Sequence, residues 1–196
     1  MMHTPEPIAA DHDVVLSSDA LLLRAFRLDD AEEIYEAVCE SKRELAPWLS
    51  WCHEQYAIAD TIAFLKGRGA AFQKDGEYAL AIVERPSGRF VGATGINQID
   101  KVVRRANLGY WLRTTATGRG YATLSTLLVA RWAFETQGLE RIEIVVATGN
   151  LPSQRVAERA GATREGIARK RLRVGSVQHD AAIYSLVHGD ALAQGD

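Results

Sequence analysis

The residues best suited to chemistry lie in one short stretch, TGRGYA, from Thr117 to Ala122. Its glycines, Gly118 and Gly120, come just before an apolar pattern at helical spacing, and a strand pattern precedes them. A helix N-terminus presents unpaired backbone N–H groups and the positive end of the helix dipole. Glycines allow that backbone to approach an anion closely. The stretch therefore predicts a phosphate-binding turn between a strand and a helix.

Two familiar nucleotide-binding patterns do not fit this turn. The dinucleotide pattern G-x-G-x-x-G/A has Thr123 in its last place and should follow the first strand of a βαβ unit. A phosphate-binding loop of the Walker type needs Gly-Lys-Ser/Thr, which the chain lacks here. A tight strand-to-helix corner without a ligand remains the structural alternative.

Composition sets broad limits on the kind of protein. The 196 residues, 47% hydrophobic and 24% charged, suit one globular domain, and a net charge of -2 does not favour nucleic acid or anionic lipid. The polar start lacks the apolar core of a signal peptide, and no apolar run is long enough to span a membrane. We expect a cytoplasmic protein with no metal site, because histidine spacing is irregular and Cys39 and Cys52 suggest reduced thiols.

The periodicities predict a single α/β domain over residues 20–190 after a flexible lead, residues 1–19. A strand at 20–26 is followed by two helices, for which Asp29 and Asp60 are the expected N-caps. The remaining elements are three antiparallel strands, the helix after the glycine turn, a strand, a short helix and a closing hairpin; the corresponding residues are 78–84, 89–99, 105–112, 124–138, 141–148, 152–160 and 164–187.

Four segments together resemble the GNAT acyltransferase superfamily. The glycine turn is similar to its acetyl-CoA loop, Gln/Arg-x-x-Gly-x-Gly/Ala, with Gly120 and Ala122 in the last two places and Thr117 in the first. Residues 150–162, NLPSQRVAERAGA, resemble the Asn-x-x-Ser-x-x-Val-x-Glu-x-x-Gly-Phe motif of the RimJ/RimL-type branch, with Ala162 for the aromatic residue. Strand LGYWL and the hairpin over 164–186 also match, so the resemblance covers about residues 21–187.

The resemblance implies a mixed, mostly antiparallel sheet of about seven strands flanked by about four helices. It also implies transfer of an acetyl group from acetyl-CoA to a primary amine by direct attack on the thioester. The amine that it favours is the N-terminal amino group of a ribosomal protein or peptide. The residues that it implies for the cofactor are Trp111, Leu112, Arg113, Thr117, Gly118, Arg119, Gly120, Tyr121, Ala122, Thr123 and Asn150.

The resemblance gives Ser153 the role of protonating the leaving CoA sulfur, and a backbone N–H near Leu112 that of stabilising the thioester oxygen. A helix cap is the plainer explanation of Ser153. Glu143 lies on an apolar strand, where a carboxylate is costly unless it faces a cleft or is paired. It is therefore a candidate base, although an outward position or a salt bridge with Arg141 or Arg113 explains it equally well.

On the acceptor side, Trp48 and Trp51 are three residues apart and would share one face of a helix. They are candidates for an acceptor groove or for ordinary core packing. The basic run from Ala168 to Arg173 is better explained as a solvated hairpin strand than as a binding site. A small amine such as an antibiotic, polyamine or amino acid remains an alternative acceptor, and a CoA-binding module without turnover an alternative class. A homodimer is compatible with the resemblance.

Overall fold

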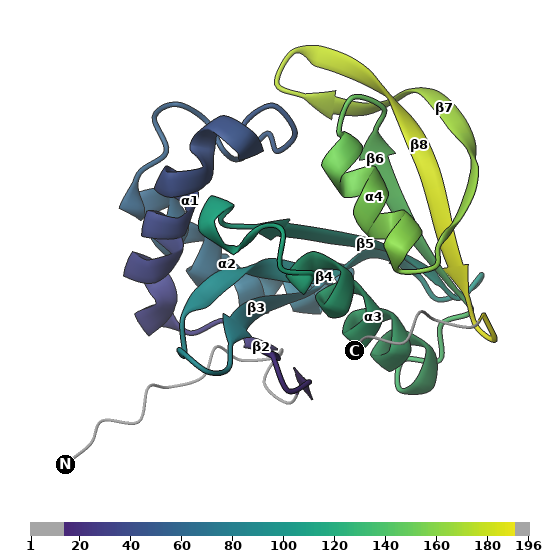
Figure 1. Ribbon diagram of the computed structural model, residues 1–196, viewed down its shortest axis with the longest axis horizontal. Helices are drawn as coiled ribbons and strands as arrows, with labels where there is room; N and C mark the ends of the chain where they lie inside the picture. The colour runs from purple at the N-terminus through teal and green to yellow at the C-terminus, as the bar shows by residue number, and fades with distance from the viewer. Residues whose placement is uncertain (1–13, 191–196) are drawn as a thin grey trace.

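The computed structural model describes residues 14–190, which form a mixed sheet with helices on both faces (Figure 1). The strands are β1 (Val15–Ser17), β2 (Leu21–Ala25), β3 (Tyr78–Glu84), β4 (Phe90–Asp100), β5 (Arg105–Leu112), β6 (Arg141–Ala147), β7 (Thr163–Val174) and β8 (Val177–Val187). The helices are α1 (Ala31–Leu45), α2 (Ile58–Asp75), α3 (Tyr121–Glu135) and α4 (Leu151–Arg159), with short 3-10 turns at Leu28–Asp30 and Thr114–Ala116.

The predicted order of elements is confirmed, and the strand count is one higher than expected. The additional strand is β1, which pairs antiparallel with β2 and lies inside the predicted flexible lead. That part of the prediction is wrong for residues 15–17; residues 1–13 and 191–196 lie outside the described part of the chain. The strands are ordered β1-β2-β3-β4-β5-β6-β8-β7 across the sheet.

Alternation along the strands creates two cores, one on each face of the sheet. In β3, Leu80 and Ile82 face the core that contains α3 and α4, whereas Ala81 faces the core that contains α1 and α2. All three side chains are fully buried, because helices cover both faces. The sheet is thus the middle layer of three.

One pair of neighbouring strands separates along its length. Strands β5 and β6 run parallel and pair only over Arg105–Asn107 and Arg141–Glu143. The rest of β5 pairs with β4 alone, and the rest of β6 with β8 alone. Figure 1 shows the half that carries α1 and α2 diverging from the half that carries α4, β6, β7 and β8 beyond this short pairing. The fold therefore opens at the end of β5, just before the glycine turn.

The starts of the first two helices differ from the sequence prediction. Asp30, rather than Asp29, accepts a hydrogen bond from the backbone N–H of Arg27 at 2.7 Å, and a 3-10 turn precedes α1. Helix α2 begins at Ile58, and Asp60 reaches back to accept from the N–H of Ala57 at 2.8 Å. Local composition located both helix starts to within two residues but did not decide which carboxylate makes the cap.

Candidate active site

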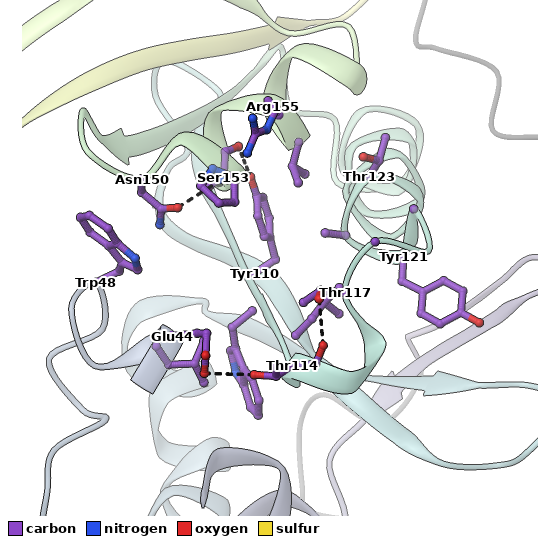
Figure 2. A pocket seen from close by; sticks show the side chains of 18 of the residues that line it. Glu44, Trp48, Tyr110, Thr114, Thr117, Tyr121, Thr123, Asn150, Ser153 and Arg155 are labelled. Carbon is purple, nitrogen blue, oxygen red and sulfur yellow. Dashed lines mark hydrogen bonds between the residues drawn. The ribbon is translucent and has the colours of Figure 1, made fainter. Parts of the chain in front are cut away.

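A cavity of about 480 Å³ occupies the opening between the two halves. Its walls come from the end of α1 and the residues after it, the end of β5, the glycine turn, the start of α3 and the exposed face of α4 (Figure 2). These segments lie far apart in the sequence, and the separation of β5 from β6 is what leaves room between them.

The glycine turn presents its backbone to this cavity. Gly118 and Gly120 both have left-handed backbone conformations, with φ of +78° and +79°, and Gly120 is the N-cap of α3 without any capping side chain. Within residues 14–190, no acceptor is found for the backbone N–H groups from Gly118 to Thr123. The first turn of α3 therefore offers vacant donors at the positive end of the helix dipole. This arrangement suits a phosphate group.

Helix α1 fixes the segment that leads from β5 into the turn. The guanidinium of Arg113, only 5% exposed, pairs with Glu40, whose Oε2 lies 3.0 Å from Nε. The hydrogen bond from Arg113 lowers the pKa of Glu40 to about 2. The other oxygen of Glu40 accepts from the N–H of Thr115 at 2.8 Å, and Ser41 Oγ accepts from the N–H of Thr114 at 2.8 Å. Arg113 thus holds the junction rather than lining the cavity.

The end of β5 directs alternate backbone groups into the opening. The N–H of Arg113 donates to the carbonyl of Val91 at 2.9 Å, so it points toward β4. In an antiparallel pair, neighbouring residues point their N–H groups to opposite sides. The N–H of Leu112 therefore points away from β4, toward the side where β6 has separated. The predicted backbone donor near Leu112 has the required direction.

Ser153 lines the cavity from the first turn of α4, opposite the end of β5. Its Oγ lies 3.0 Å from the hydroxyl of Tyr110, which also donates to the Ser153 carbonyl at 3.0 Å. Burial raises the pKa of Tyr110 to about 12, so the phenol stays protonated at neutral pH. Figure 2 shows the two side chains meeting across the cavity wall. Sequence reasoning missed Tyr110, although its place in LGYWL was a signal.

The N-cap of α4 is Asn150, not Ser153, so the cap does not explain the presence of Ser153. The Oδ1 of Asn150 accepts from the backbone N–H of Ser153 at 3.2 Å. The hydroxyl of Ser153 is consequently not used as a cap. Asn150 also lines the cavity, as the resemblance implied, and it orients the turn of α4 that carries Ser153.

Two other candidates point elsewhere. Glu143 lies in the paired part of β6, where its carboxylate is 3.0 Å from Arg141 and 3.3 Å from Arg105, and it does not line the cavity. The salt bridge with Arg141, one of the alternatives for Glu143, is therefore formed. The side chain of Arg119 pairs with Glu84 at 3.0 Å and likewise does not line the cavity. Only the backbone of Arg119 belongs to the glycine turn.

The two tryptophans line different cavities, because the segment that carries them is not helical and the shared face expected of a helix does not form. They follow α1 in a series of turns, not in a regular helix. Trp48 lines the main cavity and its ring lies 6.2 Å from the ring of His179 on β8, so it spans the two halves. Trp51 lines a second cavity of about 330 Å³ between α1, α2 and β5. Trp111 lines both cavities.

Arg155 and Arg159 also line the main cavity, and sequence reasoning did not single them out. They are four residues apart on α4 and so share one face of that helix. In the described part of the chain neither arginine makes an ion pair. Their spacing on one helix face could have identified them as a pair. It indicates a phosphate-binding role only when α4 is known to lie across the cavity from the glycine turn. Both add positive charge to the cavity that holds the vacant backbone donors.

A parallel strand pair that separates beside a helix with vacant N-terminal amides defines the N-acyltransferase class of folds. The chain belongs to the acetyltransferase (GNAT) domain family, which matches residues 20–163. The predicted resemblance and fold are confirmed, and the chain is an N-acetyltransferase of the GNAT type.

Similar proteins agree with this family, and relatives named for ribosomal-protein acetylation support the RimJ/RimL-type branch. YjcK of Bacillus subtilis, provisionally named an N-acetyltransferase, is 35% identical over 178 residues, covering 90% of this chain and 98% of YjcK. YdaF of the same organism, provisionally named a ribosomal N-acetyltransferase, is 30% identical over 182 residues, covering 87% of this chain and 92% of YdaF. The structure of the microcin C7 self-immunity acetyltransferase MccE, in complex with acetyl-CoA and AMP, superposes with a TM-score of 0.80 at 26% identity, over 87% and 94% of the two chains.

Proposed function

We propose that the protein transfers the acetyl group of acetyl-CoA to a primary amine, most typically the N-terminal amino group of a protein. The observation that carries this proposal is the set of vacant backbone donors from Gly118 to Thr123, which opens into the same cavity as Ser153. Acetyl-CoA fits because its diphosphate suits the helix terminus and its extended arm suits the splayed end of β5. Arg155 and Arg159 add charge complementary to its phosphates.

The end of β5 serves the reacting thioester. In this proposal the N–H of Leu112 donates to the thioester oxygen, where negative charge develops as the amine attacks. A backbone donor held by the sheet needs little reorganisation during the reaction, and the Arg113–Glu40 pair anchors it one residue further along the chain.

Ser153 and Tyr110 serve the leaving sulfur. The phenol of Tyr110 has one proton, which it donates either to the Ser153 carbonyl or to Ser153 Oγ. In the second case the serine proton is free to turn toward the cavity. A serine hydroxyl is a weaker acid than a thiol, so Ser153 does not remain deprotonated. It donates a hydrogen bond to the sulfur and passes on a proton that the attacking amine loses, which leaves both side chains unchanged at the end.

No carboxylate is assigned as the base. The amine must be neutral to attack, and an α-amino group titrates near pH 8 (about 7.7–8.0), so a useful fraction is neutral at physiological pH. The name of YdaF supports a ribosomal-protein acceptor, and we accordingly propose a cytoplasmic location. No helix of residues 14–190 is long and apolar enough to cross a membrane. The homodimer stays a prediction.

A small amine is the second candidate acceptor. It is favoured by the similarity to MccE, whose structure contains the small molecule AMP as well as acetyl-CoA. A protein N-terminus and a small molecule both present an amine, and the cavity does not by itself separate them.

The deciding experiment measures free thiol released from acetyl-CoA with a panel of peptides, antibiotics, polyamines and amino acids. We expect turnover with at least one peptide amine, and a fall in kcat of about 100-fold in Ser153→Ala without loss of acetyl-CoA affinity. Binding of acetyl-CoA without turnover of any amine would favour a non-catalytic module. Failure to bind acetyl-CoA at all would refute the proposal.

A further inference from the structure

The second cavity has a lining that the proposed reaction does not use. It lies between the first two helices and the residues that connect them, and five of its nine lining residues are Phe, Tyr or Trp. The lining residues are Phe26, Ile34, Val38, Trp51, His53, Tyr56, Asp60, Phe64 and Trp111. A cavity of about 330 Å³ with such walls lies at the small end of the range for ligand pockets, so it suits a single ring or a branched apolar group.

The aromatic rings form an open box rather than a closed core. Trp51 packs against Trp111 with ring centroids 5.6 Å apart, and Phe64 meets Phe26 edge to face at 5.2 Å. Trp51 and Phe64 are nevertheless each 40% exposed, which is high for large apolar side chains. Adjacent exposed aromatic side chains around a hollow are a common sign of a binding surface.

The polar groups in the lining are partly engaged by the fold. The hydroxyl of Tyr56 shares a hydrogen bond with Thr61 at 2.8 Å, and one oxygen of Asp60 accepts from the N–H of Ala57 at 2.8 Å. His53 packs edge to face against Tyr56, with ring centroids 6.0 Å apart. Apart from the second oxygen of Asp60 and the ring of His53, a ligand therefore meets aromatic ring faces and aliphatic carbons. This lining favours hydrocarbon over a charged or strongly polar group.

Trp111 connects this cavity to the reaction. It lines both cavities, and the next residue, Leu112, carries the N–H proposed to bind the thioester oxygen. The two cavities therefore meet at Trp111, beside the proposed reaction site, so the second cavity is a neighbouring place for part of an acceptor.

We infer that the second cavity binds an apolar side chain of the acceptor, about the size of leucine or phenylalanine, and selects acceptors by it. This inference rests on the proposed function, since it assigns a specificity pocket to the same acceptor. It predicts that acceptors with an apolar group near the amine are preferred over acceptors of equal charge without one.

The test uses the full chain and matched peptide amides. Alanyl-phenylalanine, alanyl-leucine, alanyl-glycine and alanyl-aspartate amides vary the second residue, and phenylalanine amide and glycine amide vary the first. Free thiol release gives kcat/KM for each, and tryptophan fluorescence with saturating CoA gives the affinity. We expect an apolar group at one of the two positions to raise kcat/KM about tenfold or more over glycine, with a parallel gain in affinity.

Variants locate the preference. Phe64→Ala removes one wall of the cavity, and Ile58→Ala is the control on the same helix, since Ile58 is 36% exposed and lines neither cavity. The ratio of kcat/KM between the apolar and the glycine acceptors should fall below about threefold in Phe64→Ala and persist in Ile58→Ala. Thermal unfolding checks that both fold, and Trp51→Ala replaces Phe64→Ala if the latter does not.

The outcomes separate the two proposals. No preference in wild-type rates or affinities overturns the inference, as does a preference that survives both Phe64→Ala and Trp51→Ala. If no amine in the panel is acetylated, the proposed function fails. The affinity series then still decides whether this cavity selects apolar groups.

Discussion

The glycine turn and the region after α1, which we propose as the acceptor side, are built in opposite ways. The turn offers backbone N–H groups from one continuous segment, residues 118–123, and needs no particular side chain except the hydrogen of glycine. The proposed acceptor side is made of side chains from helices, a loop and a strand. Trp48 and Trp51 are three residues apart in this loop, yet they line different cavities. The donors of the turn belong to the backbone, so they do not depend on the side chain of Thr117, which stands where the family has Gln or Arg. The side-chain region depends on which residues the fold brings together.

The largest expected effect tests whether the turn binds through its backbone. Gly120→Val should raise the Kd for acetyl-CoA about 30-fold, because a left-handed conformation costs a branched residue about 1–2 kcal/mol and relief of that strain reorients the donors. Isothermal titration measures the Kd.

Gly88→Val is the matched control for this variant. Gly88 has a φ of +70° against +79° for Gly120, and neither position has an atom within 4 Å of the added Cβ. Gly88 lies in the turn between β3 and β4 and does not line the cavity. Both variants should lose similar stability, but only Gly120→Val should lose affinity; equal losses of affinity would contradict a direct role of the turn.

The next largest effect is expected at the hydrogen bond between Tyr110 and Ser153. Tyr110→Phe should lower kcat about tenfold while leaving the Kd for acetyl-CoA within about twofold, because it removes one hydrogen bond to Ser153 and keeps the ring. Because the pKa of Tyr110 is raised to about 12, its phenol stays protonated from pH 6 to 9, and the loss of kcat in the variant should be the same across this range. Tyr184→Phe is the control, since its hydroxyl bonds Glu158 of α4 at 3.0 Å. A loss of kcat of equal size in both variants would make Tyr110 merely structural.

A smaller effect is expected where α1 supports the turn. Glu40→Gln should destabilise the fold by about 1–3 kcal/mol at pH 7, because Arg113 is buried and loses its counter-charge. The folded-state pKa of Glu40 is depressed from 4.5 to about 2, so its contribution is complete above about pH 4.5 and is lost as pH falls toward 2. Urea unfolding should therefore show that the free energies of unfolding of wild type and variant differ less at pH 3.5 than at pH 7. A difference that widens on acidification would refute this account.

The smallest effect is expected at Glu143. Because its carboxylate pairs with Arg105 and Arg141 and does not line the cavity, Glu143→Gln should leave kcat within about twofold. Steady-state rates across pH 6–9 provide the measurement. A fall of more than tenfold at low pH, recovering as pH rises, would instead restore Glu143 as the base.

The sequence predicted those features that depend on contiguous residues. Periodicity predicted the order of elements from β2 to β8, and the two glycines before α3 located the left-handed turn at its N-terminus. It was less successful where distant residues meet. Neither Tyr110 nor Arg155 and Arg159 were identified, because their roles depend on α4 packing across the opening from β5 and the glycine turn.

By itself, then, the sequence determined the local conformations: where each strand and helix runs, and where glycine permits a left-handed turn before a helix. The tertiary structure decided the partners. It paired Glu143 with arginines, assigned the cap of α4 to Asn150 and freed the hydroxyl of Ser153, and divided Trp48 from Trp51. Local conformation follows from the steric limits of neighbouring residues, whereas a side chain's partner depends on the position of segments tens of residues away, which only the packed fold fixes.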